Sequence, residues 1–149
     1  MKTLPNDIFF AEVERLISEG GSVVLTVNGY SMRPFIRSGR TRVVLSPCDT
    51  DSLRKGDVVL FRYRGGHVLH RIVKREGDRF ILAGDGNYKI REQCTAADIV
   101  AAVVTIIGHN GREVPHDSLR WRWGSALWTS LHPFVRRCIL ALLWRMGIR

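Results

Sequence analysis

The stretch that decides the fold is residues 57–74, DVVLFRYRGGHVLHRIVK. β-branched and aromatic side chains fill both of its halves, 57–63 and 67–74, and such side chains favour strands. An Arg-Gly-Gly tripeptide at 64–66 stands between the halves, and glycines supply the backbone conformations that a tight reversal needs. The stretch therefore predicts a β-hairpin.

Further short strands are expected on both sides of this hairpin. Their expected ranges are 22–27, 42–45, 79–83 and 99–107, followed by an Asn-Gly turn at 110–111 and a short strand ending near Val114. Closely spaced strands separated by glycine turns predict a mainly β (α+β) fold, built as a sheet or a partial barrel. One helix is expected in front of them, over residues 6–18, where apolar side chains return on one face.

The composition changes at residue 118. Residues 118–149 hold six arginines, no acidic residue and all four tryptophans of the chain. Apolar side chains recur there every three or four residues, which predicts an amphipathic helical tail interrupted at Pro133. The expected organisation is a β domain over residues 1–117 and a basic tail over 118–149. Two roles are favoured for this tail: packing on protein, including a second copy of the chain, or lying at a membrane surface. Binding to nucleic acid is the less favoured third role.

The overall composition is that of a globular protein with a basic surface. Of its 149 residues, 45% are hydrophobic and 25% are charged, which excludes a disordered or collagen-like chain. The net charge of +9 favours an anionic partner.

The sequence also limits the compartment and the cofactors. Three cysteines without a C-x-x-C pair do not make a disulfide framework and fit a reducing compartment. No stretch reaches the roughly 18 uncharged apolar residues of a spanning helix. We therefore expect a cytoplasmic protein, with peripheral contact on the inner membrane face through the tail. No nucleotide or metal motif occurs, so neither a cofactor nor a metal is expected.

A serine and a base are the groups best suited to chemistry. Ser31 lies at a sharp break in pattern directly after the first strand, and a serine hydroxyl needs a neighbouring base to become a nucleophile. His70, in the hairpin, carries an imidazole that titrates near neutral pH. An acid is needed to orient that ring, and Asp85 and Glu92 are the nearest candidates. Lys74 has the same strand parity as His70 and is an alternative base.

Four segments, in order, resemble boxes of the type I signal peptidase family. Residues 30–39 (YSMRPFIRSG) resemble its nucleophile box, and residues 55–61 (KGDVVLF) resemble its second strand. Residues 68–73 (VLHRIV) resemble the box that carries the base, and residues 80–87 (FILAGDGN) resemble its Gly-Asp box. The self-cleaving LexA-type repressors share this β fold. The resemblance therefore implies a signal-peptidase/LexA-like catalytic fold over about residues 22–107.

The histidine at position 70 is similar to the endoplasmic-reticulum and archaeal branch of that family, where histidine replaces the lysine base. The resemblance implies a Ser31–His70 pair with an acidic third member. Asp85 matches the Gly-Asp box and is narrowly preferred to Glu92. Gly29 stands where bacterial members often have a serine that supports the oxyanion, so the backbone N–H of Ser31 is the expected oxyanion donor.

The resemblance implies a serine endopeptidase that cuts a peptide or protein substrate at a leader-like segment or at one regulated site. The substrate would be bound in extended form beside a strand edge. Two alternatives are kept. One is a non-catalytic β scaffold that binds a membrane surface or a partner through residues 118–149. The other is a LexA-type regulator associated with nucleic acid, which is the less favoured partner because no helix-turn-helix is evident before the β domain.

Overall fold

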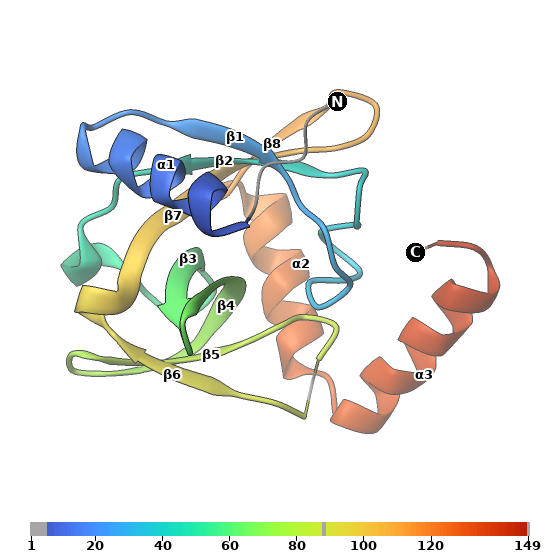
Figure 1. Cartoon of the computed structure of the whole chain (residues 1–149). Coiled ribbons are helices and arrows are strands. Elements are labelled where there is room, and N and C mark those ends of the chain that lie inside the picture. Colours follow the sequence, from blue (N-terminus) through green and yellow to red (C-terminus); the bar gives the residue numbers. More distant parts are fainter. Residues whose placement is uncertain (1–5, 88, 149) are drawn as a thin grey trace.

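The computed structural model describes residues 6–87 and 89–148, and its β-rich body has helices at both ends (Figure 1). The helices are α1 (Asn6–Ser18), α2 (Leu119–Ser130) and α3 (Pro133–Arg145), with short 3-10 turns at Thr50–Ser52 and Ala96–Asp98. The strands are β1 (Val23–Thr26), β2 (Arg42–Ser46), β3 (Val58–Tyr63), β4 (Gly66–Glu76), β5 (Arg79–Ala83), β6 (Glu92–Thr95), β7 (Ile99–Ile107) and β8 (Glu113–Pro115).

The strands form one antiparallel sheet. Their order is β1-β2-β7-β3-β4-β5-β6, and β8 adds to β7. The mainly β fold and its leading helix are therefore confirmed. β6 was not predicted, because its four residues include a single apolar side chain, Cys94, and pairing with β5 defines the strand.

Alternation along the central strands divides the core into two clusters. On one face, Val58 and Leu60 pack with residues of α1, with Met32 and Ile36 of the loop after β1, and with Trp121 of α2. The other face holds Val59, Phe61, Ile72, Phe80 and Leu82. Neighbouring residues on a regular strand point to opposite faces, and accordingly Val68 of β4 packs on the second cluster whereas Leu69 packs on the first.

The chain after residue 118 forms two helices with different surroundings. α2 buries Trp121, Ser125 and Trp128, which are spaced four and three residues apart and so share one face. α3 begins at Pro133, as the expected interruption predicts, and among its described side chains only Leu140 is buried. In Figure 1, α2 runs beside the strands and α3 lies further out. Within the described ranges, no helix combines the length and the apolar character that crossing a bilayer requires.

Candidate active site

A buried histidine–carboxylate pair lies on the face of the second core cluster. His70 Nδ1 lies 2.9 Å from Oε2 of Glu92, and both residues are only 6% exposed. Strand register brings them together. Leu82 of β5 pairs with Ile72 on one side and with Glu92 on the other, so these three residues share a face, and His70 shares it with Ile72 by alternation. Glu92 therefore occupies the position of a group that orients the imidazole.

The other acidic candidate lies on the opposite face. Asp85 accepts two hydrogen bonds from Arg71, from Nε at 2.8 Å and from Nη2 at 2.7 Å, and both side chains are 1% exposed. This geometry disagrees with the preference for Asp85 as the orienting acid. Arg71 directly follows His70 on β4, so the two side chains point to opposite faces of the sheet, and Asp85 lies with Arg71. Arg71 was not singled out in the sequence, although it directly follows His70.

Ser31 meets the histidine across a glycine. A methyl group on Gly84 would overlap the carbonyl oxygen of Ser31 and would lie 3.1 Å from Nε2 of His70. The gap between the Ser31 main chain and the His70 imidazole is therefore only about as wide as one methyl group. The N–H of Gly86 also donates to the Ser31 carbonyl at 2.7 Å. The two glycines of the Gly-Asp-Gly segment allow this close approach.

The groups of Ser31 and His70 that would react are not engaged elsewhere. Among residues 6–87 and 89–148, neither Ser31 Oγ nor His70 Nε2 has a hydrogen-bond partner, so the two are not hydrogen-bonded to each other. The backbone N–H of Ser31 has no acceptor within the same ranges. Catalytic hydrogen bonds are often longer without substrate and tighten in the substrate complex.

α2 braces the Arg71–Asp85 pair. Trp128 Nε1 donates to the backbone oxygen of Asp85 at 2.8 Å, and the Arg71 guanidinium lies over the rings of Trp121 and Phe35 at 5.3 and 5.5 Å. Arg71 Nη1 also donates to the Gly56 carbonyl at 2.8 Å. The tryptophans of α2 thus help to hold the strands that carry the site, a role that the sequence did not reveal.

Lys74 does not share the face of His70. A register irregularity between Ile72 and Lys74 breaks the alternation of β4, so the expected common parity is wrong. The Lys74 side chain is 60% exposed, and its ammonium pairs with Glu76 at 2.6 Å. It is therefore a poor candidate for the base.

A second ion-pair cluster joins α1 to the hairpin. Glu14 accepts hydrogen bonds from Arg62 at 2.8 and 2.9 Å, and His67 Nε2 lies 2.6 Å from the same carboxylate. The hydrogen bond from Arg62 is the main cause that lowers the pKa of Glu14 to about 2. His67 also stacks on Phe10, with ring centroids 4.5 Å apart, so this histidine fastens the helix to the sheet.

The structure offers no evident metal centre within its described ranges, because no three His, Cys, Asp or Glu side chains there are grouped so that they could hold an ion. The groups that the structure brings close together here are a serine, a histidine and a buried carboxylate on a β scaffold. That set of groups belongs to the serine peptidase type.

Comparison with known families supports this class. The model of the Peptidase S24-like family matches residues 3–109, most of the chain, and the protein therefore belongs to that family. The expected membership of the signal peptidase/LexA-type superfamily is confirmed, and the signal-peptidase branch stays a prediction. A search among curated proteins found no match.

Proposed function

We propose that the protein is a serine endopeptidase in which Ser31 is the nucleophile, His70 the general base and Glu92 the group that orients the base. The observation that carries the proposal is the position of His70, whose Nδ1 is occupied by buried Glu92 while Nε2 faces the Ser31 main chain across Gly84. A carboxylate on Nδ1 holds the proton there and leaves Nε2 free to accept one.

The proposed reaction has two stages. In the first, Ser31 Oγ attacks the scissile carbonyl carbon, His70 Nε2 takes the hydroxyl proton, and the same proton then passes to the leaving amine as the peptide bond breaks. In the second, water attacks the acyl carbon and loses a proton to Nε2; His70 then returns that proton to Ser31 Oγ as the ester bond breaks and the acid product leaves. The backbone N–H of Ser31 would stabilise the negative oxygen in both stages, since it has no acceptor in the described part of the chain.

The proposed substrate is a peptide in extended conformation. β1 is a terminal strand of the sheet and pairs only with β2 among the described residues. The loop that carries Ser31 follows directly after β1. A peptide that adds to the free edge of β1 would therefore run toward the nucleophile.

Labelling with a serine-reactive fluorophosphonate tests the proposal. Attack by Ser31 Oγ on phosphorus expels fluoride, and the mass of the intact chain rises by one phosphonyl group. We expect labelling of the wild type, none of Ser31→Ala, and wild-type labelling of Ser18→Ala, a matched control because Ser18 is exposed and bonds within α1. Equal labelling of Ser31→Ala and the wild type contradicts the proposal.

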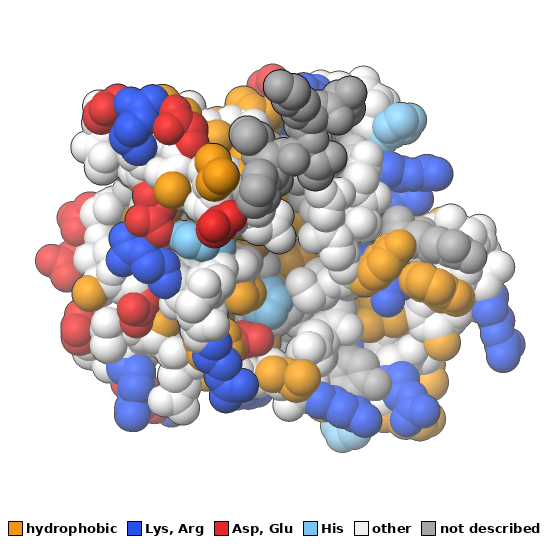
Figure 2. All heavy atoms as spheres, viewed as in Figure 1, with side chains coloured by type: hydrophobic (Ala, Val, Ile, Leu, Met, Phe, Trp, Pro, Cys, Tyr) orange, Lys and Arg blue, Asp and Glu red, His pale blue; other side chains and the backbone are white. Residues whose placement is uncertain are grey.

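A second candidate function, binding to an anionic membrane surface, is favoured by the outer face of α3. Its exposed apolar side chains include Phe134, Val135 and Leu142, and exposed Met146 follows directly after the helix. Residues 118–149 contain no acidic residue and carry six arginines. In Figure 2, apolar and basic side chains lie together on the right of the molecule, where α3 is. A basic helix with such a face suits the interface of an anionic bilayer.

Sedimentation with phosphatidylglycerol vesicles tests this second function. We expect Leu142→Ser combined with Met146→Ser to lower the bound fraction at least about fivefold, because each change removes buried apolar area at the interface. Ile8→Ser is the control, since Ile8 is also more than half exposed but lies on α1. Unchanged sedimentation contradicts membrane binding. So does a wild-type dimer that the double variant dissociates, because α3 would then serve a second copy of the chain.

A further inference from the structure

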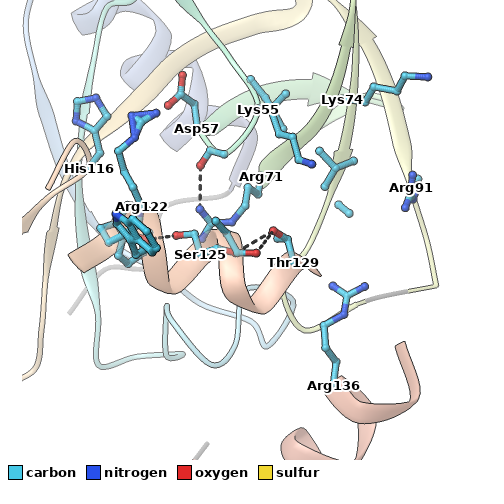
Figure 3. A pocket seen from close by; sticks show the side chains of 17 residues that line it. Lys55, Asp57, Arg71, Lys74, Arg91, His116, Arg122, Ser125, Thr129 and Arg136 are labelled. Atoms are coloured by element: carbon cyan, nitrogen blue, oxygen red, sulfur yellow. Dashed lines mark hydrogen bonds between the residues drawn. The ribbon is translucent and has the colours of Figure 1, made fainter. Parts of the chain in front are cut away.

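A large cavity opens on the side of β4 that carries Arg71, opposite to the side of His70. Figure 3 shows the side chains that line it. Its volume is about 780 Å³, within the range of small-molecule sites. Residues of β4, of the turn before β3, of α2 and of the first turn of α3 line it. Its cationic lining residues are Lys55, Arg71, Lys74, Arg91, Arg122 and Arg136.

The positive charge of this cavity is largely uncompensated. Asp57 is the one acidic residue among the described residues that line it, and its carboxylate already accepts the backbone N–H of Arg54 at 3.0 Å. Arg71 is neutralised by Asp85 and Lys74 by Glu76. Four cations remain, and within residues 6–87 and 89–148 no carboxylate pairs with them: Lys55, Arg91, Arg122 and Arg136.

Arg136 gives independent evidence that a hydrogen-bond acceptor belongs in this cavity. Its Nε is buried, yet it has no hydrogen-bond acceptor among the described residues. A buried donor on a charged group is costly when it is unpaired, so such groups in proteins normally have a partner. In Figure 3, Arg136 extends from α3 toward the space between α2 and β4, and Lys55 and Arg122 border the same space.

We propose that this cavity binds a ligand carrying at least two phosphate-type negative charges. Guanidinium groups match phosphate oxygens in a forked geometry, and each such charge-assisted bond is about twice as strong as a neutral one. Four unpaired cations around one space repel each other when it holds only water, and a multivalent anion removes that repulsion. The ligand chemistry fits either a free phosphorylated compound or a phospholipid headgroup.

The proposal is independent of the peptidase function. The two sites meet at Arg71, which lines the cavity and pairs with Asp85, and at Gly56 and Trp121, which contact Arg71, whereas His70 lies on the other face of the strand. Anion binding and serine chemistry can therefore be measured separately.

Titration calorimetry with inorganic pyrophosphate, in low and moderate salt, tests the free-ligand source. Flotation with vesicles of phosphatidic acid in phosphatidylcholine tests the lipid source. We expect saturable binding in one of these arms. The expected loss is at least about tenfold in affinity for Arg122→Gln and for Arg136→Gln, since each removes a charge-assisted contact. Arg120→Gln is the matched control, because Arg120 is exposed on the same helix and outside the cavity.

Arg122→Lys keeps the positive charge but loses the two parallel N–H donors of the guanidinium. Its affinity for the anion is expected to lie between that of the wild type and that of Arg122→Gln. Thermal melting of every variant shows that it is folded. Three results would overturn the proposal: no saturable binding in either arm, binding that is insensitive to both cavity variants, or an equal loss in Arg120→Gln, which would reflect net charge alone.

Discussion

Glu92 Oε2 lies 2.9 Å from Nδ1 of His70, and this contact is buried on the same face of the sheet as the second core cluster. We predict that Glu92→Gln lowers the rate of fluorophosphonate labelling by about 100-fold or more. The amide NH₂ of glutamine would donate to Nδ1, which moves the imidazole proton to Nε2 and leaves no lone pair there to accept the serine proton.

The measurement is the labelling rate as a function of pH. Glu113→Gln, an exposed change on β8, is the control and is expected to label as the wild type does. If Glu92→Gln is labelled at the wild-type rate and with the wild-type pH profile, Glu92 does not orient the imidazole and the prediction is wrong.

The Arg71–Asp85 pair is predicted to stabilise the fold rather than to act on substrate. Arg71→Met alone leaves the Asp85 carboxylate buried without its partner, and we expect it to lower the free energy of unfolding by roughly 3–5 kcal/mol. Arg71→Met with Asp85→Leu is expected to cost much less, because no unpaired charge remains. Urea denaturation measures both.

The exposed pair of Arg79 and Glu76 provides the control for this experiment. Arg79→Met is expected to cost under about 1 kcal/mol, since surface ion pairs contribute little. If Arg71→Met and Asp85→Leu have strictly additive effects, the two side chains are not coupled and the prediction is wrong.

Gly84 is predicted to be intolerant of any side chain. Gly84→Ala places a methyl group against the backbone oxygen of Ser31, which cannot move aside as a flexible side chain could. We expect both a lower melting temperature and slower labelling of Ser31. Gly66→Ala is the matched control, because its methyl group would meet only the Tyr63 carbonyl at 3.7 Å. Wild-type labelling by a folded Gly84→Ala protein argues against the close approach.

Glu14 is predicted to make stability depend on pH in the acid range. Its pKa falls from 4.5 to about 2 on folding, mainly through the hydrogen bond from Arg62, so the folded state binds fewer protons than the unfolded state. The stabilisation is therefore fully present above pH 4.5 and is lost as the pH falls toward 2. We expect Glu14→Gln to cost roughly 1 kcal/mol at pH 6, allowing for its partial exposure.

Chemical denaturation at pH 6, 4 and 2 measures the difference between Glu14→Gln and the wild type. That difference should shrink steadily toward zero as the pH is lowered. A difference that is constant across this range would show that the charge of Glu14 is not the cause.

Local patterns were sufficient for much of the fold. β-branched runs and glycine turns predicted the β3–β4 hairpin, and apolar periodicity predicted α1 with its observed bounds. These signals are carried by neighbouring residues, so they can be read without knowing the partners of a segment. β6 escaped because it has almost no signal of its own and becomes a strand only by pairing with β5.

The two carboxylates show where local patterns end. Asp85 and Glu92 both follow β5 within ten residues, and nothing in the sequence states which strand faces them. The register of β4, β5 and β6 decides it, since residues opposite one another share a face and a shift of one residue exchanges the faces. The register irregularity after Ile72 likewise places the side chains of Lys74 and His70 on different faces of the sheet.

The sequence by itself determined the class of fold, the serine, the histidine and the basic character of the C-terminal helices, because residue type and spacing carry that information. Only the tertiary structure decided that Glu92 meets the histidine, that Asp85 belongs to Arg71, and that four unpaired cations surround one cavity. These relations join residues distant in the chain, and strand register and helix packing bring such residues together.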